Sequence, residues 1–555
     1  MIKTEFERWC RMATDSEICE ELEKLKNNPE ELEDAFYRHL EFGTGGLRGV
    51  LGAGTNRMNI YSVRRASIGL AKYLFKNGGN RIAIGYDTRI NSRLFAETAA
   101  TAFASLGIEV RMYSEPLPTP MLSYATRALD CDAGVMITAS HNPSKYNGYK
   151  VYGADGCQIT DSAAAAILEE ISAVDYFEEL TDSFENLKNK GKIRFVDKSM
   201  LDSFIEKVRE KSHLFGDEQD KSIRITYTPL NGTGYVPVVK ILKESGYENL
   251  DLVAEQTLPD GNFPTCPYPN PEIPEALALG LEYAKKYDSD VLLATDPDSD
   301  RVGVAVKCDG GYKLLTGNEV GILLLNYICE QRTKHNKMPT HPVVVKTIVT
   351  TDLGKAIAEK YGVKVVDVLT GFKYIGEEIG RLEAEQRSES FIFGFEESCG
   401  YLGGDYVRDK DGVYAAFLVT EMAAYYRNRG ITLSDKLNSI YSEFGYSKNS
   451  LYSYSFEGAS GYEKMQAVMA EFRHGIDSFD GIPVVKTEDY INGLGDLPKS
   501  NVIKFFLENS ASIVIRPSGT EPKLKIYLSV TAECEKPAEK LTEKLRLFAE
   551  KIIYR

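Results

Sequence analysis

A serine stands directly after a short apolar run in the first third of the chain. Ser140 belongs to the segment 138–152, TASHNPSKYNGYKVY, which follows the apolar stretch 133–137. Open α/β sheets bind ligands where such strands end, so Ser140 is expected at a sheet edge, presented to solvent rather than buried. His141 and Lys150 are then candidate proton carriers or phosphate anchors. A plain turn or a helix cap is the alternative, and the absence of a G-x-S-x-G elbow argues against an esterase.

Three aspartates alternate with other residues after a second apolar run. Asp296, Asp298 and Asp300 follow the stretch 291–295 in the sequence DPDSDR, which ends in Arg301. If the turn curls, these carboxylates converge on one hard cation such as Mg²⁺, with Arg301 beside it to meet a phosphate. Two alternatives stay open: a phosphatase of the haloacid-dehalogenase type with Asp296 as nucleophile, and an acidic turn in solvent.

A glycine-bounded acidic segment follows a third apolar run, 391–393. This segment, 394–400 (GFEESCG), offers two glutamates and a serine that can bind sugar hydroxyls. Lys373, in TGFKYI, and Arg408, in YVRDKDG, flank it as candidate cationic partners. A capped helix start explains the same residues equally well.

Cations, hydroxyls and a glycine lie close together in a fourth segment, 515–526, IRPSGTEPKLKI. Backbone N–H groups of such a turn can cradle a phosphate, and an arginine adds a two-pronged hydrogen-bonding fork. The residues that would supply these contacts are Arg516, Ser518, Gly519, Thr520, Lys523 and Lys525. A protein that binds phosphate only at the Ser140 loop would not need a second phosphate-binding loop so far along the chain.

Net charge and hydropathy limit the partners. With 81 acidic against 66 basic residues, the chain carries a formal charge of −15, which disfavours nucleic acid and anionic membrane surfaces. The N-terminal residues lack the apolar core of a signal peptide. The most apolar stretch, 320–329, is far too short to span a bilayer and indicates a buried helix.

Cysteine usage indicates the compartment. The nine cysteines are dispersed without a C-x-x-C pair, and six histidines leave few co-ligands for a zinc site. An odd, scattered set fits a reducing cytosol better than a disulfide framework, so a cytoplasmic protein is expected. No pattern predicts an oligomeric state.

The elements that must position these segments alternate between strands and helices. Three strand–helix–strand units are expected. Their ranges are 81–87, 92–106 and 108–113; 222–228, 234–244 and 250–254; and 342–349, 351–361 and 363–368. A helical lead is expected over 15–42, strands within 501–530 and a closing helix over 537–553. The pattern predicts tandem α/β domains followed by a smaller α+β domain.

The four segments, in this order, resemble the signature elements of the α-D-phosphohexomutase superfamily, which includes phosphoglucomutases, phosphomannomutases and phosphoglucosamine mutases. These elements are TASHNP, DPDSDR, the GFEES loop and RPSGTEPK. Arg48, in FGTGGLRG (42–49), is similar to the family's phosphate-contacting arginine near the N-terminus. The resemblance covers nearly the whole chain.

The resemblance implies an α/β fold with three tandem mixed-sheet domains and a smaller C-terminal α+β domain around a central cleft. Each domain would contribute one loop. The expected bounds are 1–205 with the phosphoserine loop, 206–320 with the metal loop, 321–440 with the sugar-recognition loop and 441–555 with the phosphate-binding loop.

The resemblance also implies roles for single residues. Ser140 would carry the phosphoryl group, and its oxygen would hold Mg²⁺ together with the three aspartates. Lys150 matches the family's proposed general base, and Arg48, His141 and Arg301 would act around the phosphoserine. The residues expected at the sugar are Glu396, Ser398, Thr370, Gly371, Lys373 and Arg408. Those expected at the non-reacting phosphate are Arg516, Ser518, Gly519, Thr520 and Lys525.

The implied activity is that of a phosphohexose mutase, an isomerase acting on small sugar phosphates. Phospho-Ser140 would donate to the free hydroxyl, giving a hexose 1,6-bisphosphate that turns over and returns its other phosphate. The loop GFEESCGYL differs from the GEMSGH and GEQSGH forms of some relatives. Its Glu-Glu-Ser order resembles that of glucose-specific mutases, which implies glucose phosphate. Its continuation resembles the branch with phosphopentomutase and glucose-1,6-bisphosphate synthase, so mannose and pentose phosphates stay open.

Two other classes of function compete with this hypothesis. A hydrolase that uses Asp296 as nucleophile leaves the loops of Ser140 and Arg516 without a purpose. A non-catalytic sugar-phosphate sensor is disfavoured because Ser140, Lys150 and all three aspartates occur together.

Overall fold

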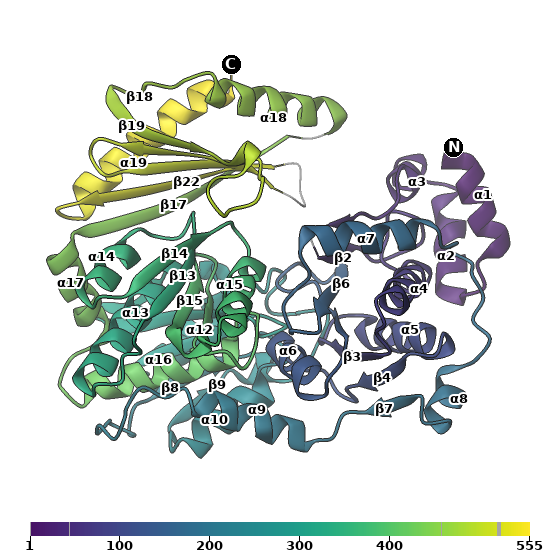
Figure 1. The fold of residues 1–555 in the computed structure, drawn as a ribbon, viewed down its shortest axis with the longest axis horizontal. Coiled ribbons are helices and arrows are strands. Elements are labelled where there is room, and N and C mark those ends of the chain that lie inside the picture. Colours follow the sequence, from purple (N-terminus) through teal and green to yellow (C-terminus); the bar gives the residue numbers. More distant parts are fainter. Residues whose placement is uncertain (1, 44, 457, 519–522, 555) are drawn as a thin grey trace.

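The computed structural model describes residues 2–43, 45–456, 458–518 and 523–554, and it forms four β-sheets one after another along the chain (Figure 1). Three helices precede the first sheet: α1 (Ile2–Met12), α2 (Ser16–Leu25) and α3 (Pro29–Phe36). The helical lead expected over 15–42 is confirmed up to Phe36, whereas Phe42 begins a strand. Helix α1 was not predicted.

The first sheet has seven strands in the order β1-β2-β6-β5-β3-β4-β7 and contains both parallel and antiparallel pairs. Its strands are β1 (Phe42–Gly43), β2 (Gly46–Val50), β3 (Arg81–Tyr86), β4 (Glu109–Met112), β5 (Ala133–Ile137), β6 (Tyr146–Gly153) and β7 (Ile193–Phe195). The helices of this region are α4 (Ile60–Lys76), α5 (Ser92–Ser105), α6 (Thr119–Ala128), α7 (Asp161–Ser172), α8 (Phe184–Asn189) and α9 (Ser199–Arg209). Strand β5 is buried throughout, as is typical of a strand covered on both faces.

The second sheet (β12-β11-β10-β8-β9) and the third (β14-β13-β15-β16) each add antiparallel strands to a parallel core. Their strands are β8 (Ile225–Thr228), β9 (Leu250–Leu252), β10 (Val291–Thr295), β11 (Val302–Cys308), β12 (Gly311–Leu315), β13 (Val343–Thr347), β14 (Lys364–Val368), β15 (Phe391–Glu396) and β16 (Gly400–Leu402). Their helices are α10 (Tyr235–Glu244), α11 (Ala254–Thr257), α12 (Pro274–Tyr287), α13 (Gly317–Lys334), α14 (Leu353–Lys360), α15 (Phe372–Ala384), η1 (Ser388–Ser390), α16 (Gly412–Arg427) and α17 (Leu433–Phe444).

One apolar core joins the second and third sheets. Helices α13 and α16 are buried almost all round and supply much of that core. The stretch 320–329 lies within α13, so the buried helix expected there is confirmed. Within the described residues, the structure contains no helix both long enough and apolar enough to cross a membrane.

The fourth sheet is wholly antiparallel, in the order β17-β22-β21-β20-β19-β18. It consists of β17 (Tyr446–Ser455), β18 (Ser478–Phe479), β19 (Ile482–Asp489), β20 (Ile503–Leu507), β21 (Ser512–Pro517) and β22 (Lys523–Ala532), with α18 (Gly458–Arg473), η2 (Tyr490–Asn492) and α19 (Glu535–Ile553). Apolar side chains of α18 and α19 share a core with this sheet. The α/β fold expected from the sequence, with three mixed-sheet domains and a smaller C-terminal α+β domain, is confirmed.

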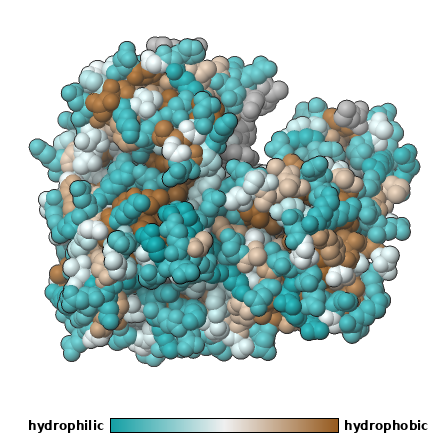
Figure 2. Space-filling model, viewed as in Figure 1, coloured by the Kyte–Doolittle hydropathy of each residue, from teal (hydrophilic) through white to brown (hydrophobic). Residues whose placement is uncertain are grey.

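The surface is deeply notched between the lobe that carries the fourth sheet and the lobe that carries the N-terminal helices (Figure 2). A central cleft was expected between these domains. The bounds 1–205, 206–320, 321–440 and 441–555 stay a prediction.

Each of the four chemistry-bearing segments lies at the connection of two consecutive antiparallel strands. Ser140 stands between β5 and β6 and the three aspartates between β10 and β11. The GFEES segment begins in β15 and ends before β16, and the last segment includes the end of β21 and the start of β22. No helix begins at Ser140 or at the GFEES segment, so the helix-cap alternatives for these two are wrong.

The N-terminal helices depend on one aromatic cluster, in which Phe36 contacts Trp9 with ring centroids 5.7 Å apart. Phe36→Ala is expected to destabilise this lead by about 3–5 kcal/mol, because it leaves a cavity beside buried rings. Trp9 is the chain's sole tryptophan. Its fluorescence should therefore change at lower denaturant concentration in this variant. Tyr37→Ala is the control, since Tyr37 is 49% exposed; equal midpoints in the two variants would contradict the prediction.

Candidate active site

Ser140 contacts Asp296, which lies in the aspartate turn after strand β10 of the second sheet. Its Oγ donates a hydrogen bond of 2.8 Å to Oδ2 of Asp296, and Nδ1 of His141 lies 3.2 Å from the same Oγ. The expectation that Ser140 is presented to solvent is wrong, because only 3% of it is exposed. The turn carrying Asp296 covers it, so the serine hydroxyl lies at a boundary between two domains.

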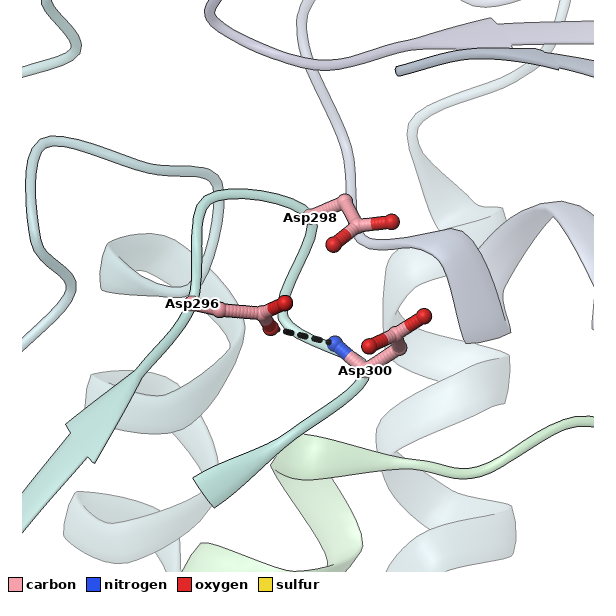
Figure 3. Close-up of side chains that lie close together, drawn as sticks. All are labelled: Asp296, Asp298 and Asp300. Atoms are coloured by element: carbon pink, nitrogen blue, oxygen red, sulfur yellow. Dashed lines mark hydrogen bonds between the residues drawn. The ribbon is translucent and has the colours of Figure 1, made fainter. Parts of the chain in front are cut away.

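The three aspartates converge, as Figure 3 shows. One carboxylate oxygen from each of Asp296, Asp298 and Asp300 lies within 4.8 Å of the others, and all three residues are buried. The turn is held by Oδ1 of Asp296, which accepts the N–H groups of Asp300 and Arg301 at 3.1 Å each. An acidic turn in solvent is therefore excluded.

Burial and mutual repulsion shape the charges of this trio. Burial, reinforced by the neighbouring Asp298 and Asp300, raises the pKa of Asp296 well above its ordinary value. Burial would also raise the pKa of Asp298, but the cations Lys150 and Lys410 outweigh it and hold that pKa well below the ordinary range.

Two lysines from different domains approach the aspartates. Nζ of Lys150, on β6, lies 2.9 Å from Oδ2 of Asp298 and 3.3 Å from Oδ2 of Asp300. Nζ of Lys410, from the segment before α16, lies 2.8 Å from Oδ2 of Asp300. The Thr119 hydroxyl also contacts the aspartates, since it donates a hydrogen bond of 2.8 Å to Oδ2 of Asp298.

Lys410 and Thr119 were not predicted from the sequence. The signal for Lys410 was the alternation of charges in RDKDG directly before a buried helix, where only Arg408 was selected. Thr119 carried no local signal, because it begins a helix of the first domain and meets Asp298 only in the folded chain.

The trio suits a hard divalent cation. Oδ1 of Asp298 and Oδ1 of Asp300 are buried and accept no hydrogen bond from any described residue. Buried carboxylate oxygens without partners are costly unless a cation meets them. Three converging carboxylate oxygens, one from each aspartate, match the ligands that Mg²⁺ prefers. Asp296, Asp298 and Asp300 are therefore the residues that would hold it.

Arginines lie around the serine. Arg301 forms an ion pair of 2.5 Å with Glu272 and lies 3.8 Å from Oδ1 of Asp300. Arg48 is exposed on β2. Burial lowers the pKa of His141 well below its ordinary value, and the charges of Arg301 and Arg48 lower it further. His141 is therefore neutral at pH 7 in this environment.

The GFEES turn brings acids toward the same region. Burial raises the pKa of Glu396 to about 7, against the opposing effect of Lys410, and Ser398 hydrogen-bonds to that carboxyl. Glu397 accepts hydrogen bonds from Thr347 and Thr350 at 3.3 and 3.2 Å. Glu396 is thus poised to accept or donate a hydrogen bond near neutral pH.

Three of the flanking residues predicted at the sugar, Thr370, Gly371 and Lys373, lie at the start of α15. Thr370 and Gly371 precede α15, and Gly371 has a φ of 124° that favours glycine. Nζ of Lys373 forms a 2.6 Å ion pair with Asp161 of the first domain.

Arg408 lies in the loop before α16. Its side chain is completely buried and donates to the Glu383 carboxylate at 2.6 Å and to the carbonyl oxygens of Asp405 and Val407. These bonds hold the loop to α15, and the place of Arg408 at the sugar stays a prediction. The cation of this loop that reaches the aspartates is Lys410.

The C-terminal segment faces the GFEES turn. Arg516 lies on β21, its Nη2 is 3.4 Å from the hydroxyl of Tyr527, and its charge lowers the pKa of Glu397, which burial raises overall. Ser518 donates its N–H to the carbonyl of Lys523 at 2.7 Å. In the register of the two strands, Lys525 on β22 lies opposite Arg516 on β21. Gly519 and Thr520 lie outside the described residues.

A buried serine, three converging carboxylates and several cations, contributed by separate domains, are the parts that phosphoryl transfer requires. Fold and site together define a phosphoryl-transfer enzyme. The comparisons with known proteins are specific. Models of the phosphoglucomutase/phosphomannomutase α/β/α domains I, II and III match residues 39–177, 202–311 and 316–444.

Relatives match over almost the whole chain. A phosphoglucomutase from Staphylococcus haemolyticus is 37% identical over 516 residues, which are 90% of this chain and 92% of that protein. One from Staphylococcus aureus is 36% identical over 544 residues, 94% and 95% of the two chains. The chain therefore belongs to the phosphoglucomutase/phosphomannomutase family of the α-D-phosphohexomutase superfamily, whose members are isomerases that transfer phosphoryl groups.

Solved structures share the fold. A putative phosphomannomutase from Thermus thermophilus superposes with a TM-score of 0.70 at 22% identity, covering 93% of this chain and 100% of its own. The phosphoglucomutase parafusin from Paramecium gives 0.66 at 18% identity, covering 94% and 96%. The resemblance to the superfamily inferred from the sequence is confirmed.

Proposed function

We propose that this protein interconverts glucose 1-phosphate and glucose 6-phosphate through a phosphoserine at position 140 and a glucose 1,6-bisphosphate intermediate. The observation that carries the proposal is the 2.8 Å bond between the Ser140 hydroxyl and Asp296 of the aspartate trio. Relatives named phosphoglucomutase, at 35–37% identity, favour glucose. The bisphosphate is also the proposed activator.

Charge neutralisation is the first task of the proposed site. A phosphoserine carries a charge of about −2 and must approach a second, anionic phosphate. Lys410, Arg301 and Arg48 supply the positive charge around Ser140. Mg²⁺ held by the trio would neutralise the carboxylates and polarise the phosphoryl oxygens.

Proton transfer is assigned to Lys150. Burial lowers its pKa, but Asp298 and Asp300 raise it more, so Lys150 is a cation while these carboxylates are unneutralised. With Mg²⁺ bound, these carboxylates would be neutralised and Nζ of Lys150 would take the proton of the attacking sugar hydroxyl. As that oxygen bonds to phosphorus, the bond to Oγ of Ser140 would break, leaving Oγ deprotonated for the return transfer. The return transfer reverses these movements on the other hydroxyl.

Sugar and distal phosphate are held by the other two loops. Glu396 and Ser398 bind sugar hydroxyls, and Thr370, Gly371 and Lys373 line the same side. The loop of Arg516, with Ser518, Gly519, Thr520 and Lys525, grips the phosphate that does not react. Holding it while the bisphosphate turns keeps the intermediate from water. The partners are thus small sugar phosphates, with neither nucleic acid nor membrane, and the proposed location is the cytoplasm.

A coupled mutase assay tests the substrate. Glucose, mannose, glucosamine and ribose 1-phosphates, each primed with a hexose bisphosphate, are compared by kcat/KM. Glucose 1-phosphate is expected to give the highest value. A higher value for mannose or ribose 1-phosphate would assign the protein as a phosphomannomutase or a phosphopentomutase.

Lys410→Met tests the cation that the sequence did not reveal. Removing a buried charge beside Asp300 is expected to lower kcat by about 10–100-fold, because transition-state charge loses a neighbour in a site of low dielectric. Lys307→Met is the control, since Lys307 pairs with Asp288 on the surface. Equal kcat values for the two variants would remove Lys410 from the site.

A further inference from the structure

The backbone of the Ser140 turn has an unusual conformation. Ser140 has a φ of 52°, in the left-handed region that residues with side chains rarely adopt. Such a conformation persists only where surrounding contacts enforce it. The side-chain chemistry proposed above does not explain what holds this turn.

One buried arginine supplies those contacts. Arg89, which is 3% exposed, donates hydrogen bonds to four carbonyl groups of the turn. Nη2 binds those of Ser140 and Asn142, and Nη1 binds those of Pro143 and Tyr146 at 3.0 and 3.1 Å. A planar guanidinium has several donors in a fixed fork, so it can hold acceptors that a lysine ammonium, a single point charge, cannot hold together.

Arg89 is itself fixed from two sides. Within the first domain, the Asp87 carboxylate lies 3.3 Å from Nε and also accepts the Arg89 N–H at 3.0 Å and the Ser92 hydroxyl at 2.7 Å. From the second domain, the ring of Phe263 stacks on the guanidinium with its centroid at 5.0 Å. The contact is close, since a Cβ on Gly261 would lie 2.5 Å from the backbone nitrogen of Ile90.

We propose that Arg89 is a positioning residue, which holds the Ser140 turn so that Oγ points at Asp296. Through Phe263 it also ties this turn to the domain that carries the aspartates. Arg89 touches neither Oγ nor the carboxylate of Asp296 in any described contact; it acts through the backbone. This inference rests on the proposed function, since it concerns the serine that accepts the phosphate.

The test uses the full chain with two replacements, Arg89→Gln and Arg89→Lys, and a control, Arg93→Gln. Arg93 is 66% exposed on α5 and pairs only with Glu97 among the described ion pairs. The measurements are kcat, KM for glucose 1-phosphate, and the rate at which dephosphorylated protein takes labelled phosphate from glucose 1,6-bisphosphate. Both Arg89 variants are expected to lose about 100-fold in kcat and in labelling rate, with KM changed less than about threefold, because a displaced reacting atom slows transfer without weakening binding.

A folded Arg89→Gln protein with kcat within about threefold of wild type would overturn the inference. Full recovery in Arg89→Lys would overturn it too, because charge alone would then suffice. If Arg89→Gln does not fold, Phe263→Leu is the deciding variant, because it keeps the guanidinium and removes the ring that stacks on it. Labelling is expected to slow about 3–10-fold. An unchanged labelling rate would overturn the inference. Wild-type protein that takes no label would instead overturn the proposed function.

Discussion

Ser140→Ala is expected to lower kcat by about 10⁴-fold or more, because the acceptor of the transferred phosphate is removed. Binding of glucose 6-phosphate should remain, since the sugar and distal phosphate are assigned to the loops of Glu396 and Arg516. The measurements are the coupled mutase assay for kcat and isothermal calorimetry for affinity.

The control for this experiment is Ser172→Ala, which removes an exposed hydroxyl at the end of α7 in the same domain. It should leave kcat unchanged. A Ser140→Ala protein that keeps turnover within tenfold of wild type would contradict the phosphoserine. A wild-type protein that binds sugar phosphates without isomerising any of them would be the sensor that the sequence disfavoured.

Asp298→Asn is expected to have the second largest effect. The change removes a negative charge from the trio and leaves Lys150 beside a neutral amide. We expect kcat to fall by about 10²–10³-fold and the Mg²⁺ concentration for half-maximal activity to rise at least tenfold, because an amide oxygen is a weaker ligand than a carboxylate. Protein freed of metal by a chelator is titrated with Mg²⁺ while activity and thermal unfolding are followed.

Asp309→Asn is the matched control, because Asp309 is exposed in the turn after β11, the strand that follows the trio. It should respond to Mg²⁺ as the wild type does. If Asp298→Asn responds identically to this control, the trio is not the metal site. Wild-type activity that survives chelation would contradict a metal requirement altogether.

The sequence predicted the local structure of the site well. Each signature segment follows an apolar run, and β5, β10, β15 and β21 lie at those runs. A run of buried residues followed by turn-forming ones determines a strand and its end through local chemistry alone. The alternation of strands and helices indicated tandem α/β domains, and the order of the segments indicated the family.

Contacts between domains could not be predicted in the same way. The burial of Ser140 results from the Asp296 turn, which is 156 residues away. The bonds of Thr119 to Asp298 and of Lys410 to Asp300 likewise exist only after the domains pack. A local pattern contains no information on which distant surface will cover it, so exposure of Ser140 was predicted wrongly.

Arg408 illustrates the same limit at short range. Arg408 and Lys410 stand two residues apart in one charged segment. The backbone directs the first to an ion pair with Glu383 and the second to Asp300. Residue type alone does not distinguish the two cations, and only Arg408 was named as a partner of the GFEES segment.

The identity of the phosphorylated residue tests the central claim most directly. Wild-type protein is incubated with labelled glucose 1,6-bisphosphate, quenched in acid, digested and mapped by mass spectrometry. The account predicts one acid-stable phosphate on Ser140. A phosphate that hydroxylamine releases, mapped to Asp296, would contradict it and identify an aspartyl-phosphate hydrolase instead.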